Sequence, residues 1–233
     1  EKILKKKVVI LEKRNHIGGN CFSETDNLTG IEYHKYGTHI FHTSIPRVIK
    51  YLKDFTKFNS YRHQVLSHYK KKIYQMPVNL ETINSFYSKN FSPVQAESFI
   101  KNKRKKFLKN SYKNFEEKAK SQIGQELYEA FFKNYTKKQW GKDPKELPGS
   151  IFNRLPLRYN YDEDYYKNPT LQGIPTDGYT EIFKKLTSSK NIQLIFNHEY
   201  SLKKNYDVKH LTIYTGPLDR LFNYKFGNLE WTL

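Results

Sequence analysis

Residues 8–20, which read VVILEKRNHIGGN, decide the fold class of this chain. The stretch opens with a continuous apolar run at Val8–Leu11, rich in β-branched residues, which is typical of a parallel strand buried on both faces. The lysine-rich residues 1–7 before it are typical of a helix end, where cations are favoured. A helix end, a buried strand and an acid at the carboxyl end of that strand predict the second half of a βαβ dinucleotide-binding unit.

The residues after this strand have the chemistry to hold a dinucleotide. Glu12 stands where a carboxylate accepts hydrogen bonds from a ribose diol, although an ordinary charge at a strand end is the alternative. Gly18 and Gly19, followed by Asn20, offer backbone N–H groups that can approach an anion closely. Arg14 can add a charge-assisted contact to phosphate or stack on adenine. With the strand, this run resembles the FAD-binding stretch of the glutathione-reductase-like flavoproteins, so we expect FAD as the cofactor.

Composition limits the function only loosely. The 233 residues are 37% hydrophobic and 16% aromatic, which indicates a folded chain rather than a disordered one. The net charge of +18 favours phosphate-bearing partners, and nucleic acid is the first that charge alone suggests. A bias toward Lys, Asn, Ile, Tyr and Phe accounts for the charge without any function. Since no nucleic-acid-binding module is recognisable, we expect no nucleic-acid partner.

Cysteine usage and hydropathy bear on the cellular compartment. Cys21 is the single cysteine, which excludes an intramolecular disulfide and a cysteine-only metal site. No stretch approaches the roughly 20 apolar residues of a membrane span, and the charged residues 1–7 do not form a signal peptide. We expect a cytoplasmic protein without a membrane span, and the sequence leaves its oligomeric state open, a homodimer included.

Residues 36–43, which read YGTHIFHT, carry His39 and His42. A zinc site would need both histidines and a third ligand on one helical face, but no carboxylate is suitably placed and the neighbours favour an extended segment. We therefore expect no metal. Our hypothesis is that His39 lies against the flavin ring as a catalytic residue and tunes the charge near the reactive nitrogen. A hydrogen-bonded core histidine is the alternative.

Ordered blocks over nearly the whole chain resemble the bacterial UDP-galactopyranose mutases. The blocks are residues 13–20, 34–43, 76–79, 135–141, 154–158, 172–175 with 178–180, and 214–219. Their order is that of the family, and so many ordered matches are not expected by chance.

This resemblance implies an α/β fold, namely a FAD/NAD(P)-binding Rossmann-like parallel sheet with an inserted helical domain and an added antiparallel sheet. The expected parts are 1–60 (partial FAD-binding domain), 61–79 (first part of a sheet domain), 80–145 (helical insertion), 146–177 (second part of the sheet domain, with a mobile loop) and 178–233 (return to the FAD-binding domain, truncated). Hydrophobic patterns agree with this, and they predict strands at 65–74, 192–196 and 211–215, helical structure over 80–138 and a helix that opens at 178–181.

The resemblance also implies the reaction, which is the interconversion of UDP-galactopyranose and UDP-galactofuranose for cell-surface polysaccharide biosynthesis. FAD would act in its reduced form, with its N5 attacking the anomeric carbon to give a flavin–sugar adduct as UDP leaves. The cofactor would supply the nucleophile, which fits a sequence in which no Ser-His-Asp set or carboxylate pair stands out.

Several aromatic residues are candidates for binding the substrate. Phe131, Phe132, Tyr135 and Trp140 have spacings that place most of them on one side of a helix end, and such a stripe more often belongs to a core. The resemblance implies instead that Phe132 and Tyr135 hold the uracil, and that Thr136 and Trp140 line the pocket.

The remaining site residues also follow from the resemblance. It implies that Arg154 is the catalytic arginine that closes over the UDP pyrophosphate, where a guanidinium fork suits two anionic oxygens. Tyr165 would donate its hydroxyl to a phosphate, and Asn79 would contact the nucleotide or the sugar. The segment that ends in Thr215 and Gly216 is expected to return beneath the cofactor and contact it.

The sequence departs from the family pattern at both ends. The glycine-rich turn expected before residue 8 is missing, as is the family's C-terminal third, and residues 230–233 read EWTL where the family usually has EYRS. We therefore expect a fragment that binds FAD poorly and is inactive alone. The alternatives are another FAD-dependent enzyme of the same superfamily and a basic nucleic-acid-binding protein.

Overall fold

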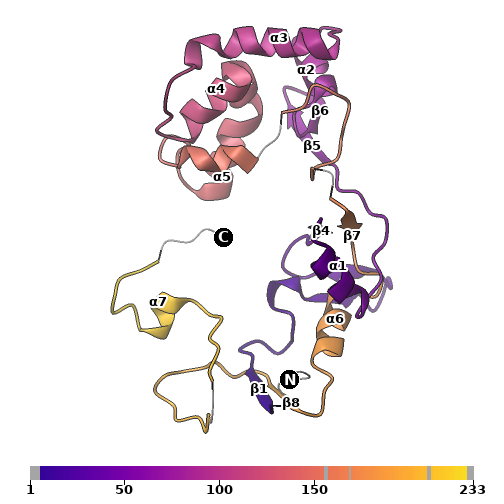
Figure 1. The fold of residues 1–233 in the computed structure, drawn as a ribbon, viewed down its shortest axis with the longest axis vertical. Coiled ribbons are helices and arrows are strands. Elements are labelled where there is room, and N and C mark those ends of the chain that lie inside the picture. The colour runs from indigo at the N-terminus through magenta and orange to yellow at the C-terminus, as the bar shows by residue number, and fades with distance from the viewer. Residues whose placement is uncertain (1–5, 155–156, 168, 209–210, 230–233) are drawn as a thin grey trace. The chain divides into compact units, whose positions relative to one another are not determined.

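The computed structural model describes residues 6–154, 157–167, 169–208 and 211–229. The chain forms two compact units: unit 1 comprises Glu1–Tyr61 and Pro169–Trp231, and unit 2 comprises Arg62–Asn168. Both units contain helices and strands (Figure 1), so the predicted mixture of the two is confirmed.

The parallel strands of unit 1 come from distant parts of the sequence. Strand β1 (Val8–Leu11) lies parallel to β8 (Ile192–Ile195), with Val8 opposite Ile192. Both are short apolar runs, and the strands predicted at these two places are confirmed. Val9 is nevertheless 56% exposed, so one face of the pair is open in the described part of the chain, whereas the sequence predicted burial on both faces.

Two antiparallel strand pairs complete the sheet structure described for unit 1. Strand β2 (Ser23–Thr25) pairs with β3 (Glu32–His34), and β4 (Phe41–Thr43) pairs with β7 (Leu171–Gly173). The helical segments of this unit are η1 (Gly19–Cys21), a 3-10 turn, and the helices α1 (Pro46–Lys53), α6 (Tyr179–Leu186) and α7 (Leu218–Leu221).

Helix α6 begins where the sequence predicts it, directly after Gly178. The Ser23 hydroxyl oxygen accepts hydrogen bonds from the backbone N–H groups of Tyr179 (2.9 Å) and Thr180 (3.4 Å), which satisfies free donors of the first turn. Gly178 has φ +79°, and a side chain there would collide with the carboxylate of Glu32. The glycine therefore lets β2 and β3 approach the start of the helix.

The strand predicted at 211–215 is wrong. Residues 211–215 form no strand in the structure, and Ile213 is 77% exposed. The pattern of β-branched and polar residues fits a half-buried strand, but a strand also needs a hydrogen-bonding partner, and the described residues provide none for this segment.

Unit 2 begins with a β-hairpin. Strand β5 (Val65–Tyr69) pairs antiparallel with β6 (Lys72–Met76) across a two-residue turn at Lys70 and Lys71, whose φ angles are +46° and +65°. The single strand predicted over 65–74 is therefore wrong. Two-residue hairpin turns usually contain Gly or Asn, because these residues tolerate positive φ. A pair of lysines does not indicate such a turn.

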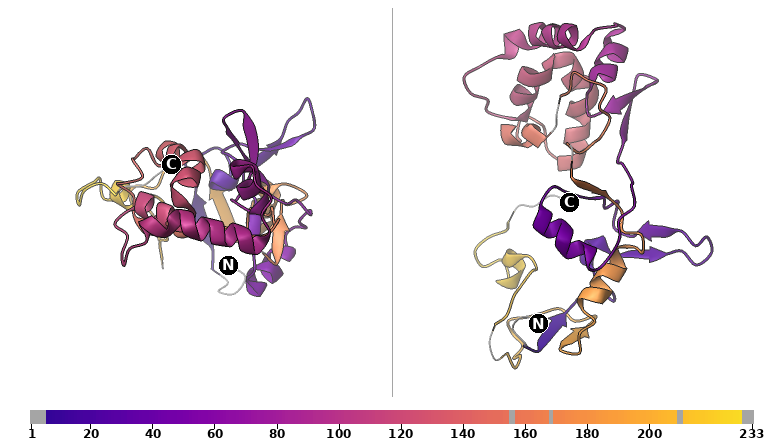
Figure 2. Two further views of the ribbon diagram at one scale, coloured as in Figure 1. Left: turned by 90° about the horizontal axis from the view of Figure 1, so that it is seen from above. Right: turned by 45° about the vertical axis from the view of Figure 1, so that its right-hand side comes forward.

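Helices make up most of the rest of unit 2. They are α2 (Leu80–Tyr87), α3 (Pro93–Arg104), η2 (Lys105–Phe107), α4 (Phe115–Leu127), η3 (Tyr128–Phe132, a π-helical turn), α5 (Lys133–Trp140) and η4 (Gly149–Arg154, a 3-10 helix). Helix α3 packs against α4 (Figure 2). The helices α2, α3 and α4 and the turn η3 contribute to one core, which includes the fully buried side chains of Ile83, Ile100, Leu127 and Tyr128.

Polar side chains fix the helix starts in unit 2. Asn79 caps α2 and Asn114 caps α4, each accepting from a backbone N–H three residues later. Ser92 and Gln95 form a capping box at the start of α3, with Pro93 in the first turn. Of the helices that the structure describes, none has the length and apolar character needed to cross a membrane.

Candidate functional site

The predicted site residues fall into two sets, and each set belongs to one unit. The predicted cofactor residues lie in unit 1 and the predicted substrate residues lie in unit 2.

Glu12 follows β1 and is held by the backbone on both sides. Its N–H donates to the carbonyl oxygen of Ile195 (2.9 Å), and its own carbonyl accepts from the N–H of His198 (3.0 Å). The carboxylate oxygen Oε1 accepts from the N–H of Arg14 at 2.9 Å. The acid thus closes the turn after the strand, at the carboxyl end where the sequence predicts a ribose.

Of the two terminal guanidinium nitrogens of Arg14, Nη2 has a hydrogen-bond partner and Nη1 has none among the described residues. Its guanidinium lies 4.3 Å from the centre of the Tyr36 ring, and Nη2 donates to Asn20 Oδ1 at 2.8 Å. Nη1 is buried and has no hydrogen-bond partner among the described residues. A buried cationic donor without a partner is unfavourable, so this atom fits an oxygen of an anionic ligand.

The two glycines of the turn have different surroundings. Gly18 has φ +93°, and a Cβ there would lie 2.8 Å from Cδ2 of Phe183, so this glycine is needed for packing against α6. Gly19 has φ +57°, and a Cβ there would meet nothing within 4 Å. Of the pair, Gly19 is the one with space for a ligand beside its backbone.

Sequence reasoning missed the buried His16. Its Nε2 lies 2.6 Å from the Tyr36 hydroxyl, and its ring stacks on Phe22 with the centroids 3.9 Å apart. His16 therefore anchors the tyrosine on which Arg14 rests. His16 stands between Arg14 and the two glycines in the sequence. Its partner Tyr36 lies twenty positions further on, and no local sequence pattern connects the two residues.

His39 is tied to its own turn. Its Nδ1 lies 2.8 Å from the carbonyl oxygen of Gly37, and its backbone N–H donates to Nδ1 of His34 at 3.0 Å. Burial, and then the charge of His39, lower the pKa of His34. The rings of both histidines lie edge-on to Tyr179. Among the described residues, no cluster of three or more potential ligand side chains could hold a metal ion.

Thr215 and Gly216 are exposed and lie in the segment before α7. The Tyr214 hydroxyl donates to the carbonyl oxygen of Pro217 at 3.3 Å and closes a turn around them. The described contacts join this segment to Tyr200, whose ring lies 6.0 Å from that of Tyr214. None of the described hydrogen bonds or ring contacts joins Thr215 or Gly216 to Arg14 or to its partners Asn20 and Tyr36.

In unit 2, the predicted aromatic stripe divides into buried and exposed members. Phe131 is 7% exposed and its ring meets those of Tyr74 (5.1 Å) and Phe86 (5.4 Å), while Phe132 meets Phe152 (5.5 Å). Both phenylalanines lie in η3, and both belong to the core of the unit.

The residues after η3 are arranged differently. Tyr135 is 62% exposed, Thr136 is buried, and Trp140 packs partly against the core. Tyr135 is thus the member of the predicted uracil pair whose ring faces outward from unit 2.

Asn79 is fully buried at the start of α2. Its Oδ1 accepts from the N–H (2.9 Å) and hydroxyl (3.0 Å) of Thr82, and its Nδ2 donates to the carbonyl oxygen of Asp162 (3.3 Å). Its polar atoms are therefore engaged within the protein.

Tyr165 is half-buried between two rings. His63 and Tyr166 lie edge-on to it at 5.4 and 5.2 Å, and its N–H donates to the carbonyl oxygen of His63. Burial, with smaller contributions from Tyr135 and Tyr166, raises the pKa of Tyr165, so its hydroxyl remains a hydrogen-bond donor at neutral pH. Arg154 ends η4, and its side chain lies outside the described part of the structure.

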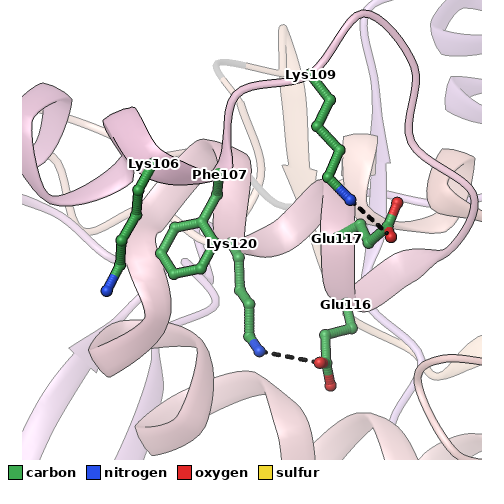
Figure 3. A pocket seen from close by; sticks show the side chains of 6 residues that line it. All are labelled: Lys106, Phe107, Lys109, Glu116, Glu117 and Lys120. Carbon is green, nitrogen blue, oxygen red and sulfur yellow. Dashed lines mark hydrogen bonds and ion pairs between the residues drawn. The ribbon is translucent and has the colours of Figure 1, made fainter.

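A hollow on unit 2 is not the predicted site. The hollow has a volume of about 180 Å³. Figure 3 shows the side chains that line it, which are Lys106, Phe107, Lys109, Glu116, Glu117 and Lys120. Lys109 pairs with Glu117 (3.0 Å) and Lys120 with Glu116 (2.9 Å), so much of its charge is neutralised locally. None of the predicted site residues lines it, and it belongs to a solvated basic face.

Two family models match the chain. Residues 130–233 match the family described as UDP-galactopyranose mutase, and residues 1–55 match the one described as NAD(P)-binding Rossmann-like domain. The second match confirms the Rossmann-like part of the predicted fold class.

Curated proteins are similar to the chain along almost its whole length. A dTDP-fucopyranose mutase of Escherichia coli is 39% identical over 231 residues, covering 97% of this chain and 60% of that protein. A probable UDP-galactopyranose mutase of Klebsiella pneumoniae is 40% identical over 224 residues, covering 96% of this chain and 58% of that protein. A UDP-galactopyranose mutase of Mycoplasma genitalium is 29% identical over 242 residues, covering 97% and 59%. The chain thus spans about 60% of the length of these relatives.

Proposed function

We propose, because residues 130–233 match the UDP-galactopyranose mutase family, that the whole protein is an isomerase that interconverts UDP-galactopyranose and UDP-galactofuranose. The observation that carries the proposal is the similarity to named mutases over almost the entire chain, at 39–40% identity for two of them. The Rossmann-like match at residues 1–55 supports a dinucleotide cofactor, and we propose FAD.

The turn after β1 fits the adenosine end of FAD. Glu12 stands where a ribose diol would bind, Gly19 leaves room beside its backbone, and the buried Nη1 of Arg14 needs an acceptor. Asn20 holds the other guanidinium nitrogen, so Arg14 is preorganised for a phosphate oxygen. When bound and reduced, the flavin would supply a nucleophile for the anomeric carbon of the sugar.

The residues of unit 2 would bind and orient the nucleotide sugar. We propose that Arg154 and Tyr165 contact the diphosphate, the arginine through its charge and the tyrosine through its protonated hydroxyl. Tyr135 offers an exposed ring for the uracil, and Trp140 would line the same pocket. Phe131 and Phe132 would act from the core, by holding the helix that carries Tyr135.

A second candidate function has a specific observation in its favour. The relative from Escherichia coli is a dTDP-fucopyranose mutase, and it is as similar to this chain as the Klebsiella relative is. The two nucleotide sugars share the diphosphate that Arg154 and Tyr165 would bind. They differ in the base methyl group, the ribose 2′-hydroxyl and the sugar 6-hydroxyl, and these groups would decide between them.

A competition experiment tests the proposal. The whole protein, reduced with dithionite, receives equal amounts of UDP-galactofuranose and dTDP-fucofuranose, and chromatography follows both. We expect UDP-galactofuranose to be converted at least tenfold faster, since a missing hydroxyl partner costs a polar site more than 1.4 kcal/mol, which is about a factor of ten. Faster conversion of the dTDP sugar would establish the second candidate, and conversion of neither would overturn both.

A further inference from the structure

Arg158 is a buried cation beneath the segment that carries Tyr165. Its side chain is 9% exposed. Its backbone N–H donates to the carbonyl oxygen of Val78 at 3.0 Å, which joins the start of the segment to the residues just before α2. Since burying a guanidinium is unfavourable unless it is paired, its partners indicate what it does.

The partners of Arg158 are mainly backbone carbonyl groups. Its Nη1 donates to the carbonyl oxygens of Asp162 (3.3 Å) and Asp164, and lies 3.1 Å from Oδ2 of Asp162. Its Nη2 is buried without a hydrogen-bond partner among the described residues. Because the carbonyl groups belong to the residues just before Tyr165, these contacts fix the main chain that leads into it.

Asn79 holds the same segment from the start of α2. Its Nδ2 donates to the carbonyl oxygen of Asp162 that Arg158 also contacts. The N–H of Leu80 donates to the carbonyl oxygen of Asn160 at 3.0 Å. Residues 160–164 contain no helix or strand, so these side chains supply the order that a regular element would otherwise provide.

We propose that Arg158 is a positioning residue, which fixes the backbone of residues 162–164 so that the Tyr165 hydroxyl meets the substrate diphosphate. This inference rests on the proposed function. Arg158 would not touch the substrate, because the side-chain contacts described for it go to this segment and its exposed surface is small. Asn79 would assist it through the shared Asp162 carbonyl, which differs from the substrate contact expected from the sequence.

Comparing UDP with uridine separates positioning from general stability. If Arg158 acts through Tyr165 on the diphosphate, Arg158→Met weakens binding of UDP and leaves binding of uridine unchanged. A residue that only stabilises the fold would affect both ligands alike. Calorimetric titration of the full chain with each ligand measures the two dissociation constants directly.

We expect Arg158→Met to raise the UDP dissociation constant about tenfold, as for the loss of one charge-assisted hydrogen bond. In a Tyr165→Phe background the same substitution should add less than a factor of two, since the group it positions is already gone. Arg62→Met is the matched control: Arg62 is exposed and, among the described residues, its side chain pairs with the carboxylate of Asp164 in the same segment, so UDP binding should stay within twofold.

The outcomes distinguish this inference from the proposed function. Failure of the unaltered protein to bind UDP would overturn both. Unaltered UDP affinity in Arg158→Met, equal losses for UDP and uridine, or a full tenfold loss in the Tyr165→Phe background would overturn only the role of Arg158. If Arg158→Met does not fold, Arg158→Lys replaces it, since an ammonium can hold one of the two carbonyl groups and part of the UDP affinity should remain. Equal losses for UDP and uridine in that variant would contradict the inference.

Discussion

Arg14 carries a charge that the described part of unit 1 satisfies only in part. Its ring partner Tyr36 and its amide partner Asn20 hold the guanidinium in place, while Nη1 is buried and unpaired. An unpaired buried donor costs about 1–3 kcal/mol. A phosphate oxygen at this point would remove that cost, which supports the proposal that Arg14 contacts the cofactor.

Replacing Arg14 should therefore weaken FAD binding. For Arg14→Met we expect the FAD dissociation constant of the whole protein to rise by about tenfold to a hundredfold, corresponding to about 1.5–3 kcal/mol for a hydrogen bond to a charged group. Flavin fluorescence titration measures it. Lys13→Met, which removes a neighbouring exposed charge, is the control. Equal effects of the two substitutions would show that only general charge matters.

Gly18 should matter for stability more than Gly19. Both have positive φ, but only at Gly18 would a Cβ press on the Phe183 ring. We expect Gly18→Ala to lower the free energy of unfolding by about 1–3 kcal/mol more than Gly19→Ala, the usual cost of overpacking. Urea denaturation of both variants gives the difference. Equal losses would mean that the ring moves aside freely.

The stability of unit 1 should depend on pH through His34. Burial and the charge of His39 hold the pKa of His34 below its usual 6.5. The unfolded chain then binds a proton more readily than the folded one, so this contribution is intact above pH 6.5 and is lost as the pH falls toward the folded pKa. His34→Gln should reduce the fall in Tm between pH 7.5 and 5.5. An unchanged fall would assign it to other groups, such as His63 of unit 2, whose pKa burial also lowers.

At the turn after β1, some of the residues expected to bind the cofactor could be predicted from the sequence, and their supporting residue could not. Glu12, Arg14, Gly19 and Asn20 stand within nine positions, so their chemistry can be read together, and the structure places Arg14 beside Asn20. The support from His16 depends on Tyr36, which reaches it only once the chain has folded. Local patterns carry no information on that contact.

Among the elements, the start of α2 shows how one side chain can serve two purposes. Asn79 caps the helix through Oδ1 and holds the segment before Tyr165 through Nδ2. The sequence marks Asn79 as a candidate for substrate contact because of its block. Its burial and its partner at Asp162, far along the chain, appear only in the fold.

Substitutions at Asn79 should separate these two purposes. Asn79→Asp retains the cap but loses the Nδ2 donor, whereas Asn79→Ala loses both. We expect Asn79→Ala to cost about 1–2 kcal/mol more than Ser92→Ala, a cap at an exposed helix start, because burial adds to the usual capping loss. Thermal unfolding of Asn79→Asp, Asn79→Ala and Ser92→Ala gives the loss of stability in each variant, and the loss should be larger for Asn79→Ala than for Ser92→Ala. A larger loss in Ser92→Ala would contradict the importance of burial.

The helices of unit 2 and the strands β1 and β8 could be predicted because their apolar spacing is local. The β5–β6 hairpin could not, since Lys70 and Lys71 adopt positive φ without the residues that usually mark such turns. Residues 211–215 have the pattern of a strand, but a strand is completed by its partner, which a local pattern does not contain.

For the whole molecule, the two units divide the predicted residues by role. Unit 1 carries those expected to hold the cofactor, and unit 2 carries those expected to hold the nucleotide sugar. Sequence similarity connects both units to the same relatives, and it runs through 97% of the chain for the relative from Escherichia coli. The division agrees with a reaction in which a cofactor supplies the reactive group while the protein binds and orients the substrate.

Dependence of turnover on the redox state of the flavin is the sharpest test of the proposed function. The whole protein is loaded with FAD and incubated with UDP-galactofuranose, with and without dithionite, and the appearance of UDP-galactopyranose is followed by chromatography. The proposed function predicts conversion in the reduced sample and a rate lower by at least tenfold in the oxidised one, with no net consumption of reductant. Equal rates in both samples, or no conversion in either, would contradict it.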